Sequence, residues 1–528
     1  MTAKIQRLNE IGIALSAEKD LNALLEQILN GAKELTHADG GSLYTVTEDN
    51  TLRFEVIATD SLGIRMGGTS DTPISFPEIP LTSDGDLNRA NIVACAVNEK
   101  RVINIDDAYE TENYDFTGTR AFDRETGYRT QSILTIPLTN HEDQIIGVLQ
   151  LINACDARDA VIPFGEEAQS LAASLASQAA VALTNQRLID ELQHLFEAFT
   201  QMIATAIDQK SPYTGSHCRR IPVLTMMLAE ACDRVQEGPL ADFSMSEKDR
   251  YELQTAAWLH DCGKVTSPES VMDKATKLET VFDRIELIDT RFEVLRRDCE
   301  IEYLKQCAKG QGDESAYREK LAQIDDDRDF LRVSNIGGEF MTEAHQDRVR
   351  QIAKTQWTNP DGESVPFLTD EEVYNLTIPK GTLTPEERTI INNHMVATIN
   401  MLEALPFPKH LQRVPEYAGG HHEKMDGTGY PKGLKKEEMS VPARLMAIAD
   451  IFEALSARDR PYKQGKTLTE CLKILGFMKK DDHIDPDILD VFIQEKVYQD
   501  YANRYMHESQ VEEVDWSQVP GVKPPQTH

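Results

Sequence analysis

The chain has 528 residues, more than one hydrophobic core usually holds, so we expect two or more domains. Its hydrophobic content of 40% and charged content of 27% are those of an ordinary globular protein. The net charge of −33 argues against nonspecific binding to DNA or to anionic membranes, which both require basic surfaces.

Neither the apolar runs nor the cysteines indicate a membrane or secreted protein. No apolar run approaches the roughly 18 residues that a membrane span needs. The first residues, Met1 to Glu10, lack the apolar centre of a signal peptide. The cysteines are scattered without a Cys-x-x-Cys pair, a pattern typical of reduced thiols. We therefore expect a cytoplasmic protein without membrane insertion.

Residues 1–185 alternate between helical and strand patterns. Apolar residues recur at helical spacing from Ile5 to Leu35. Two strand pairs follow, at residues 42–58 and 132–153, and each pair is joined by a short polar loop. A helix, antiparallel strands and a closing helix together predict an α+β domain of the sensory type.

This first region resembles a GAF domain. The segment from Phe122 to Leu134 is similar to GAF domains of cyclic-nucleotide phosphodiesterases and adenylyl cyclases. The resemblance implies a cyclic nucleotide as ligand, held by Phe122, Asp123, Thr130 and Asn153. The signature of those domains is incomplete, because Ala154 replaces a lysine. Binding of another small molecule, or dimerisation without a ligand, therefore remains an alternative.

An apolar heptad continues past the point where a GAF closing helix should stop. Its members are Leu171, Leu175, Ala182, Ile189, Leu192, Phe196, Phe199 and Ile203, with the polar Gln178 and Asn185 on the same seam. Polar residues at such positions can determine register and the number of strands in a coiled coil. A closing helix that packs on its own sheet is one interpretation. We favour the other, a signalling and dimerisation helix over residues 186–205 in a homodimer.

The C-terminal half carries histidines and aspartates in a pattern that suits metal binding. The candidate ligands are His217, His260, Asp261, His394, His421, His422 and Asp450. Imidazole and carboxylate without thiolate favour iron or manganese over a structural zinc. This ligand set suits two metal ions bridged by one carboxylate. Such pairs commonly hydrolyse phosphate esters, because one ion activates water while both hold the phosphoryl oxygens.

The same residues carry a resemblance to the HD-GYP domain, a family of cyclic-di-GMP phosphodiesterases within the HD metal-dependent phosphohydrolases. His260-Asp261 matches the pair that names the superfamily, and Gly429-Tyr430-Pro431 matches the second motif. The resemblance implies an all-α HD-type domain over residues 206–507. As a hypothesis, Asp261 bridges two ions, Fe or Mn. The first ion would be held by His217, His260 and Asp450, and the second by His394, His421 and His422.

The resemblance also implies roles around the phosphate. Asp261 and Lys264 are the predicted catalytic residues, with Lys264 stabilising a phosphate oxygen. The predicted substrate contacts are Lys264, Gly429, Tyr430, Arg444, Arg460 and Lys463. Glu423 and Asp426 are expected to orient histidines or to cap their loop. Tyr213 stands where some family members carry a glutamate for a third metal, which favours a dinuclear site.

A long segment, residues 279–382, separates Asp261 from His394. Two charged helical runs flank a break at Gly310-Gln311-Gly312 and predict an inserted helical hairpin. The proline-containing tail, residues 508–528, is expected to be disordered.

The predicted protein is thus multidomain: an α+β GAF domain, a linker helix and an all-α HD-type domain with a helical insertion. We expect hydrolysis of cyclic-di-GMP to pGpG, and further to GMP, under GAF control. One alternative is a phosphohydrolase for another cyclic dinucleotide or nucleotide. Another is a non-catalytic nucleotide-binding signalling protein. The resemblance also implies a diguanylate cyclase domain as a partner.

Overall fold

The computed structural model describes residues 2–83, 85–210, 217–338, 340–458 and 465–525. Tyr213 and the predicted substrate contacts Arg460 and Lys463 lie outside these ranges. The chain divides into two compact units, Met1–Leu195 and Phe196–His528. Within the described ranges, every helix is too short or too polar to cross a lipid bilayer.

The first unit is an α+β domain, as predicted. Its elements are α1 (Thr2–Ala17), α2 (Leu21–Thr36), β1 (Ala38–Val46), β2 (Thr51–Thr59), β3 (Ile64–Gly67), β4 (Ile79–Pro80), β5 (Thr82–Ser83), β6 (Asp86–Leu87), α3 (Ile92–Asn98), β7 (Ile103–Ile105), α4 (Thr117–Thr126), β8 (Ile133–Thr139), β9 (Ile145–Cys155), β10 (Val161–Ile162) and the start of α5 (Glu166–Lys210). The patterns predicted α1 and α2 as one helical run, and also β1, β2, β8 and β9, but missed short elements such as α3 and β7.

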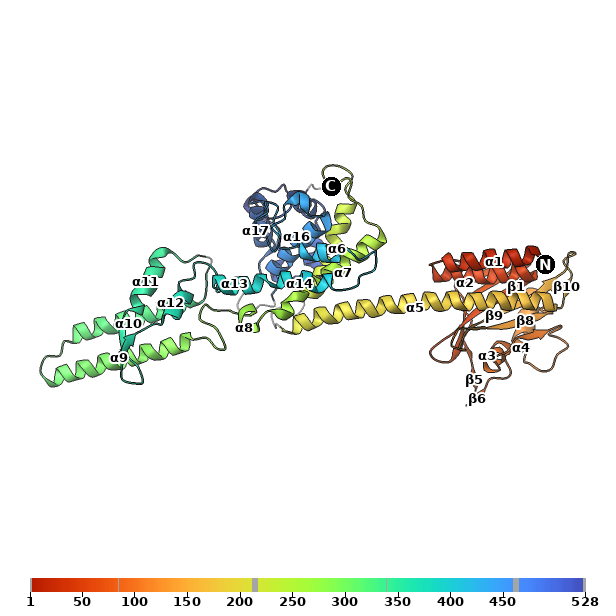
Figure 1. Ribbon diagram of the computed structural model, residues 1–528, viewed down its shortest axis with the longest axis horizontal. Coiled ribbons are helices and arrows are strands. Elements are labelled where there is room, and N and C mark those ends of the chain that lie inside the picture. Colours follow the sequence, from red (N-terminus) through yellow and green to blue (C-terminus); the bar gives the residue numbers. More distant parts are fainter. Residues whose placement is uncertain (1, 84, 211–216, 339, 459–464, 526–528) are drawn as a thin grey trace. The chain divides into compact units, whose positions relative to one another are not determined.

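An antiparallel sheet with strand order β3-β2-β1-β9-β8-β7 forms the centre of this unit. Helices α1, α2 and α5 cover one face through a core that includes Leu25, Leu43 and Leu175, and α3 lies on the other (Figure 1). Gly41 allows the central strands to approach, because a Cβ there would lie 2.6 Å from the Gln150 carbonyl oxygen. The sheet therefore has a hydrophobic core on both faces.

Helix α5 is a single continuous helix, as the long heptad predicted. Of the predicted seam, Ile189, Leu192, Phe199 and Ile203 are exposed, as a free seam requires. Ala182 and Phe196 are half-buried, whereas Val181 and Leu195 are exposed. Phe196 turns inward because it packs edge-on against Phe407, with ring centroids 6.4 Å apart. The exposed seam therefore keeps Asn185, Leu192 and Phe199 from the predicted one, and only its alternate positions move by one residue.

The second unit is almost entirely helical, as predicted. Its elements are α6 (His217–Asp233), α7 (Glu247–Leu259), η1 (Cys262–Thr266), α8 (Glu269–Met272), α9 (Ile285–Ala308), α10 (Glu314–Asn335), α11 (Glu343–Ala353), β11 (Gln356–Thr358), β12 (Ser364–Pro366), α12 (Asp370–Leu376), α13 (Pro385–Asn392), α14 (His394–Glu403), α15 (Val414–Gly419), η2 (Lys436–Glu438), α16 (Val441–Ser456), α17 (Leu468–Lys480), α18 (Pro486–Gln494), α19 (Val497–Tyr505), η3 (Glu508–Gln510) and η4 (Trp516–Gln518). Helix α6 packs against α7 and α16, and η1 packs against α14. Their shared core contains Leu253, Tyr417 and Phe452.

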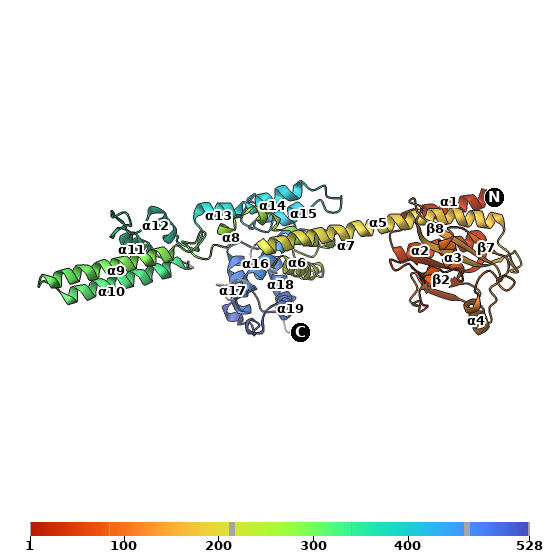
Figure 2. The same ribbon diagram turned by 90° about the horizontal axis from the view of Figure 1, so that it is seen from below.

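The insertion contains the predicted helical hairpin, formed by α9 and α10 (Figure 2). It also holds α11, α12 and a small core of its own around Phe292 and Phe367. At its base, the buried ammonium group of Lys277 donates hydrogen bonds to the carbonyl oxygens of Leu376 (3.0 Å) and Ile378 (2.8 Å). This residue therefore holds the two ends of the insertion together.

The predicted disorder of the tail is wrong for residues 508–525. Val519 is buried in the core of the unit, and Trp516 packs edge-on against Tyr498 with ring centroids 6.0 Å apart. The Gln510 side-chain amide donates hydrogen bonds of 2.9 Å to the carbonyl oxygens of Ser456 and Lys466. These few apolar and amide anchors outweigh the proline content on which the prediction depended.

Candidate metal centre

Helix ends bring most of the candidate ligands together. His217 and His394 are the first residues of α6 and α14, and His260 directly follows α7. The remaining ligands are Asp261, at the start of η1, His421 and His422, just after α15, and Asp450, within α16. Segments that are far apart in sequence therefore converge on one point of the helical unit.

Asp261 lies between two groups of imidazoles. Its Oδ2 is 3.1 Å from His260 Nε2 and 3.5 Å from His217 Nε2. Its Oδ1 is 3.3 Å from His394 Nε2 and 4.0 Å from His421 Nε2. Ligand atoms of His217, His260 and Asp261 lie within 4.8 Å of one another, as do those of Asp261, His394, His421 and His422.

Asp450 joins the first of these groups, with Oδ1 3.2 Å from His217 Nε2 and 3.9 Å from His260 Nε2. The hypothesis of two ions assigns these three residues, His217, His260 and Asp450, to the first ion. The ions, and the role of each residue toward them, stay a prediction.

Backbone carbonyl groups hold three of the imidazoles with Nε2 toward the centre. The Nδ1 atoms of His260, His394 and His421 each lie within hydrogen-bonding distance of the carbonyl oxygen three residues earlier, at 2.8, 2.5 and 2.7 Å. A neutral imidazole that donates through Nδ1 keeps its lone pair on Nε2. These side chains are therefore held in the tautomer that a metal requires.

Unpaired polar atoms at the centre fit a bound metal. Within the described ranges, Nε2 of His260, His394 and His421 and Oδ1 of Asp261 are buried without a hydrogen-bond partner. Leaving one such group unpaired costs about 1–3 kcal/mol. Lone pairs directed at one another are repulsive unless a cation lies between them. The donor set of nitrogen and oxygen suits Fe or Mn.

The protonation states of Asp261, His421 and His422 are also those of metal ligands, which must be deprotonated to bind. Burial and the neighbouring histidines hold the pKa of His421 well below its usual range. Burial lowers the pKa of His422 to about 4. Burial alone would raise the pKa of Asp261, but the Lys264 ammonium group and His260 lower it well below its usual value. The imidazoles of His421 and His422 are thus neutral and Asp261 is ionised at neutral pH.

Glu453 is a residue of this centre that the sequence analysis missed. Its carboxylate is fully buried, accepts a hydrogen bond of 2.5 Å from Arg220 Nε, and contacts His217 Nδ1. His217 therefore differs from the three histidines that backbone carbonyl groups orient. The available signal was its place one helical turn after Asp450, on the same side of α16.

His217 is correspondingly more basic than His421. Burial alone would lower the pKa of His217, but its contacts with Asp261, Asp450 and Glu453 raise it well above the usual value. Burial opposes ionisation of Glu453, while His217 and Arg220 hold its pKa below normal. A negatively charged partner on Nδ1 makes His217 a stronger electron donor than an imidazole that only a backbone carbonyl group orients.

The loop after His422 is held by its own contacts. Both Glu423 carboxylate oxygens accept backbone N–H groups, from Lys432, Gly433 and Leu434. Glu423 therefore caps the loop, one of its two expected roles. The ring of Tyr430 stacks on His422, with centroids 4.8 Å apart and planes 21° apart. A Cβ at Gly429 would lie 2.4 Å from a backbone nitrogen, so Gly429 permits close packing within the loop.

Lys264 lies at the centre, but Arg444 does not. Lys264 Nζ is 2.6 Å from Asp261 Oδ2, close enough to reach a phosphate bound at the centre. Arg444 instead pairs with the buried carboxylate of Asp485. Lys436 Nζ also lies 3.1 Å from Asp485. The contact of Arg444 with substrate stays a prediction.

The predicted GAF ligand contacts have structural roles. The buried Asp123 carboxylate accepts hydrogen bonds from Thr130 N and Oγ1, at 2.8 and 2.9 Å, and from the Tyr109 hydroxyl. Asn153 binds the backbone of residues 129 and 131. Phe122 is half-buried on α4. These polar groups connect the loop after α4 to β9, and their contact with a ligand stays a prediction.

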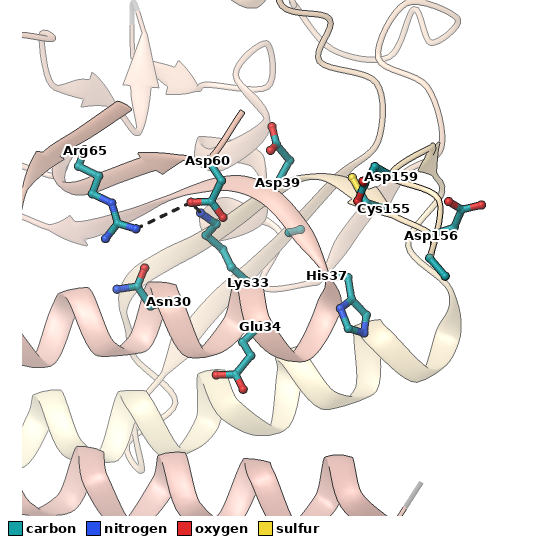
Figure 3. Close-up of a pocket in the computed structure, with 12 residues that line it drawn as sticks. Asn30, Lys33, Glu34, His37, Asp39, Asp60, Arg65, Cys155, Asp156 and Asp159 are labelled. Carbon is teal, nitrogen blue, oxygen red and sulfur yellow. Dashed lines mark ion pairs between the residues drawn. The ribbon is translucent and has the colours of Figure 1, made fainter. Parts of the chain in front are cut away.

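A pocket of about 700 Å³ opens elsewhere in the first unit, at the C-terminal end of α2 (Figure 3). None of the four predicted ligand contacts lines it. Its basic groups are paired with Asp60, whose Oδ1 lies 2.9 Å from Lys33 Nζ and 4.0 Å from Arg65 Nη2. Asp60 therefore neutralises part of the positive charge of the residues that line the pocket.

Comparison with known families identifies two domains. A GAF domain model matches residues 20–183, and an HD domain model matches residues 369–488. The chain therefore contains a GAF domain and an HD domain, as predicted. The HD match includes His394, His421 and Asp450 but not His217 or the His260-Asp261 pair, which lie before the insertion.

Curated relatives match parts of the chain. A probable cyclic di-GMP phosphodiesterase of Vibrio cholerae serotype O1 is 36% identical over 140 residues, covering 25% of this chain and 31% of the relative. The 3'3'-cGAMP-specific phosphodiesterase 3 of the same organism is 26% identical over 299 residues, covering 56% of this chain and 38% of the relative. The chain thus spans less than two fifths of each of these relatives.

Among solved structures, the GAF domain of the Acinetobacter phosphoenolpyruvate-protein phosphotransferase is similar over 36% of this chain and 98% of the chain in that structure. It is 15% identical, with a TM-score of 0.27.

Proposed function

We propose that this protein is a metal-dependent phosphodiesterase that opens cyclic-di-GMP to pGpG, and hydrolyses pGpG further to GMP, under control of its GAF domain. The placement of Asp261 carries the proposal, because its two carboxylate oxygens face two separate groups of imidazoles. The relatives named above support the substrate class, since they are named for cyclic di-GMP and 3'3'-cGAMP. Hydrolysis of 3'3'-cGAMP is the second candidate activity.

The residues of the centre divide the chemistry between them. When bound, two divalent cations, Fe or Mn, supply a polarised phosphate and a more acidic attacking water. Asp261 keeps the two groups of histidines at a fixed separation, and Glu453 orients His217. Lys264, beside Asp261, donates to a non-bridging phosphate oxygen and offsets the charge that develops there.

The HD domain is proposed to be of the HD-GYP type, on the sequence Gly429-Tyr430-Pro431. This loop is also the proposed contact for a diguanylate cyclase domain. The proposed compartment is the cytoplasm, on the cysteine pattern of the sequence. The proposed signalling helix, residues 186–205, lies within α5.

Turnover by the purified protein tests the activity. The protein is loaded anaerobically with Fe²⁺ or Mn²⁺ and incubated separately with cyclic-di-GMP, 3'3'-cGAMP and pGpG, and the products are separated by chromatography. We expect pGpG to appear from cyclic-di-GMP only in metal-loaded samples. Faster loss of 3'3'-cGAMP would select the second candidate. Nucleotide binding without turnover at any metal load would establish the non-catalytic signalling protein instead.

A homodimer through α5 is also proposed. Val181, Leu188, Leu195 and Met202 recur at heptad spacing on this helix and are 51%, 46%, 53% and 56% exposed. Leu192 and Phe199 fill the alternate positions of the same seam and are also exposed. Asn185 occupies the next alternate position, where asparagine favours two-stranded, in-register pairing. An apolar seam of this regularity is complementary to its own copy.

The double variant Leu188→Glu/Leu192→Glu is expected to be monomeric where the wild type is dimeric, because like charges would face each other across the seam. Analytical ultracentrifugation measures the change. His194→Glu is the matched control, since His194 is exposed on the same helix but off the seam. A monomeric wild type, or a dimeric double variant, would rule out this interface.

A further inference from the structure

The last turn of α5 holds two elements that carry metal-ligand candidates. Asp208 and Lys210 lie in this turn, and both contact segments at the edge of the centre. Ala204 and Ile207, on the preceding positions, are buried in the core of the HD unit. The turn is therefore fixed to the domain while it contacts the centre.

Lys210 caps the short helix η1, which begins directly after Asp261 and contains Lys264. Its ammonium group donates to the carbonyl oxygens of Lys264 (3.4 Å), Val265 and Ser267 (2.7 Å). Carbonyl groups at a helix end lack partners within the helix and carry partial negative charge. A lysine ammonium has three donors, so this single side chain can satisfy all three oxygens. Lys210 thereby fixes the end of η1 opposite Asp261.

Asp208 holds the other element. Its Oδ1 accepts a hydrogen bond of 3.4 Å from the backbone N–H of Cys218, the second residue of α6. The N–H groups in the first turn of a helix lack partners within the helix and favour a carboxylate. His217 is the first residue of α6, so this contact fixes the backbone that carries the histidine.

We propose that the last turn of α5 is a positioning device that sets the separation of His217 from Asp261, and that Lys210 is its principal residue. His217 Nε2 and Asp261 Oδ2 are 3.5 Å apart, and each is fixed by an anchor from the same turn. Asp208 and Lys210 are two residues apart and project from different sides of α5, so a rotation of the helix displaces the two anchors in different directions and changes the pocket for the ion beside His217. Because α5 begins in the GAF domain, this turn is the route by which that domain controls metal affinity.

This inference rests on the proposed metal-dependent activity, and its test distinguishes the two. The full-length variants Lys210→Met and Lys210→Arg are compared with the wild type. Gln209→Met is the matched control, because Gln209 is exposed in the same turn and receives the same new side chain. The affinity for Mn²⁺ is measured by competition with a chromophoric chelator, and kcat and KM are measured separately.

In Lys210→Met, the ion beside His217 is expected to bind about tenfold more weakly, and the other ion, which shares Asp261, is weakened less. The kcat at limiting metal falls with little change in KM, and Lys210→Arg recovers most of the affinity because guanidinium also donates to several carbonyl groups. Gln209→Met behaves as wild type. Equal weakening of both ions, or wild-type affinity in Lys210→Met, overturns the inference. A wild type that binds no metal overturns the proposed function itself.

Discussion

Asp261→Asn is expected to lower kcat for cyclic dinucleotide by at least about a thousandfold, since both catalytic cations depend on this carboxylate. Asparagine has nearly the same shape but carries no charge and only one acceptor oxygen. In the structure the two oxygens of Asp261 face different histidines, at 3.1 Å from His260 and 3.3 Å from His394. The substitution therefore removes the Asp261 carboxylate oxygen that faces at least one of the two groups of histidines.

The decisive measurements on Asp261→Asn are the number of metal ions retained and the rate at saturating metal. We expect fewer than two ions per chain and no recovery on adding metal. Asp242→Asn is a suitable control, because Asp242 is exposed and lies outside the cluster. An Asp261→Asn protein that kept two ions and the wild-type rate would show that the centre lies elsewhere.

Glu453→Gln is expected to weaken metal binding and turnover by about 10- to 100-fold, the usual cost of changing a residue that orients a metal ligand. The amide can still contact His217 but removes the negative charge that Arg220 Nε contacts at 2.5 Å. Removing one partner of a buried ion pair costs about 3–5 kcal/mol of unfolding free energy, and glutamine retains part of it. We therefore expect a lower melting temperature as well.

The pH dependence of Glu453→Gln gives an independent check. The folded-state pKa of Glu453 lies below its usual value, so its contribution to stability is complete above the unfolded pKa, about 4.3. That contribution is lost as the pH falls through the folded-state pKa. The difference in melting temperature between wild type and Glu453→Gln should shrink in acid. Glu437→Gln, at an exposed position, should show no such difference. Wild-type metal affinity in Glu453→Gln would refute its orienting role.

The metal-ligand candidates could be found from the sequence because they belong to the residue types that bind metals and recur in a recognisable order. The helical insertion and the continuous α5 were predictable for a similar reason, since helical periodicity is a local property of the chain. The hydrogen-bond partners of the predicted GAF ligand contacts were not predictable. Asp123 and Asn153 match a pattern for binding, but only the folded unit shows that their polar groups are used by Thr130 and by the backbone of neighbouring residues.

The amino-acid sequence by itself determined the two domain types, the order of the histidines and aspartates, and the length of the helix that links the domains. These features depend on residue identity and short-range periodicity. Only the tertiary structure decided that Glu453 contacts His217, that Arg444 pairs with Asp485, and that Lys210 caps η1. Each of those pairings joins residues more than 40 positions apart, and no local pattern records which distant partner a buried charge will meet.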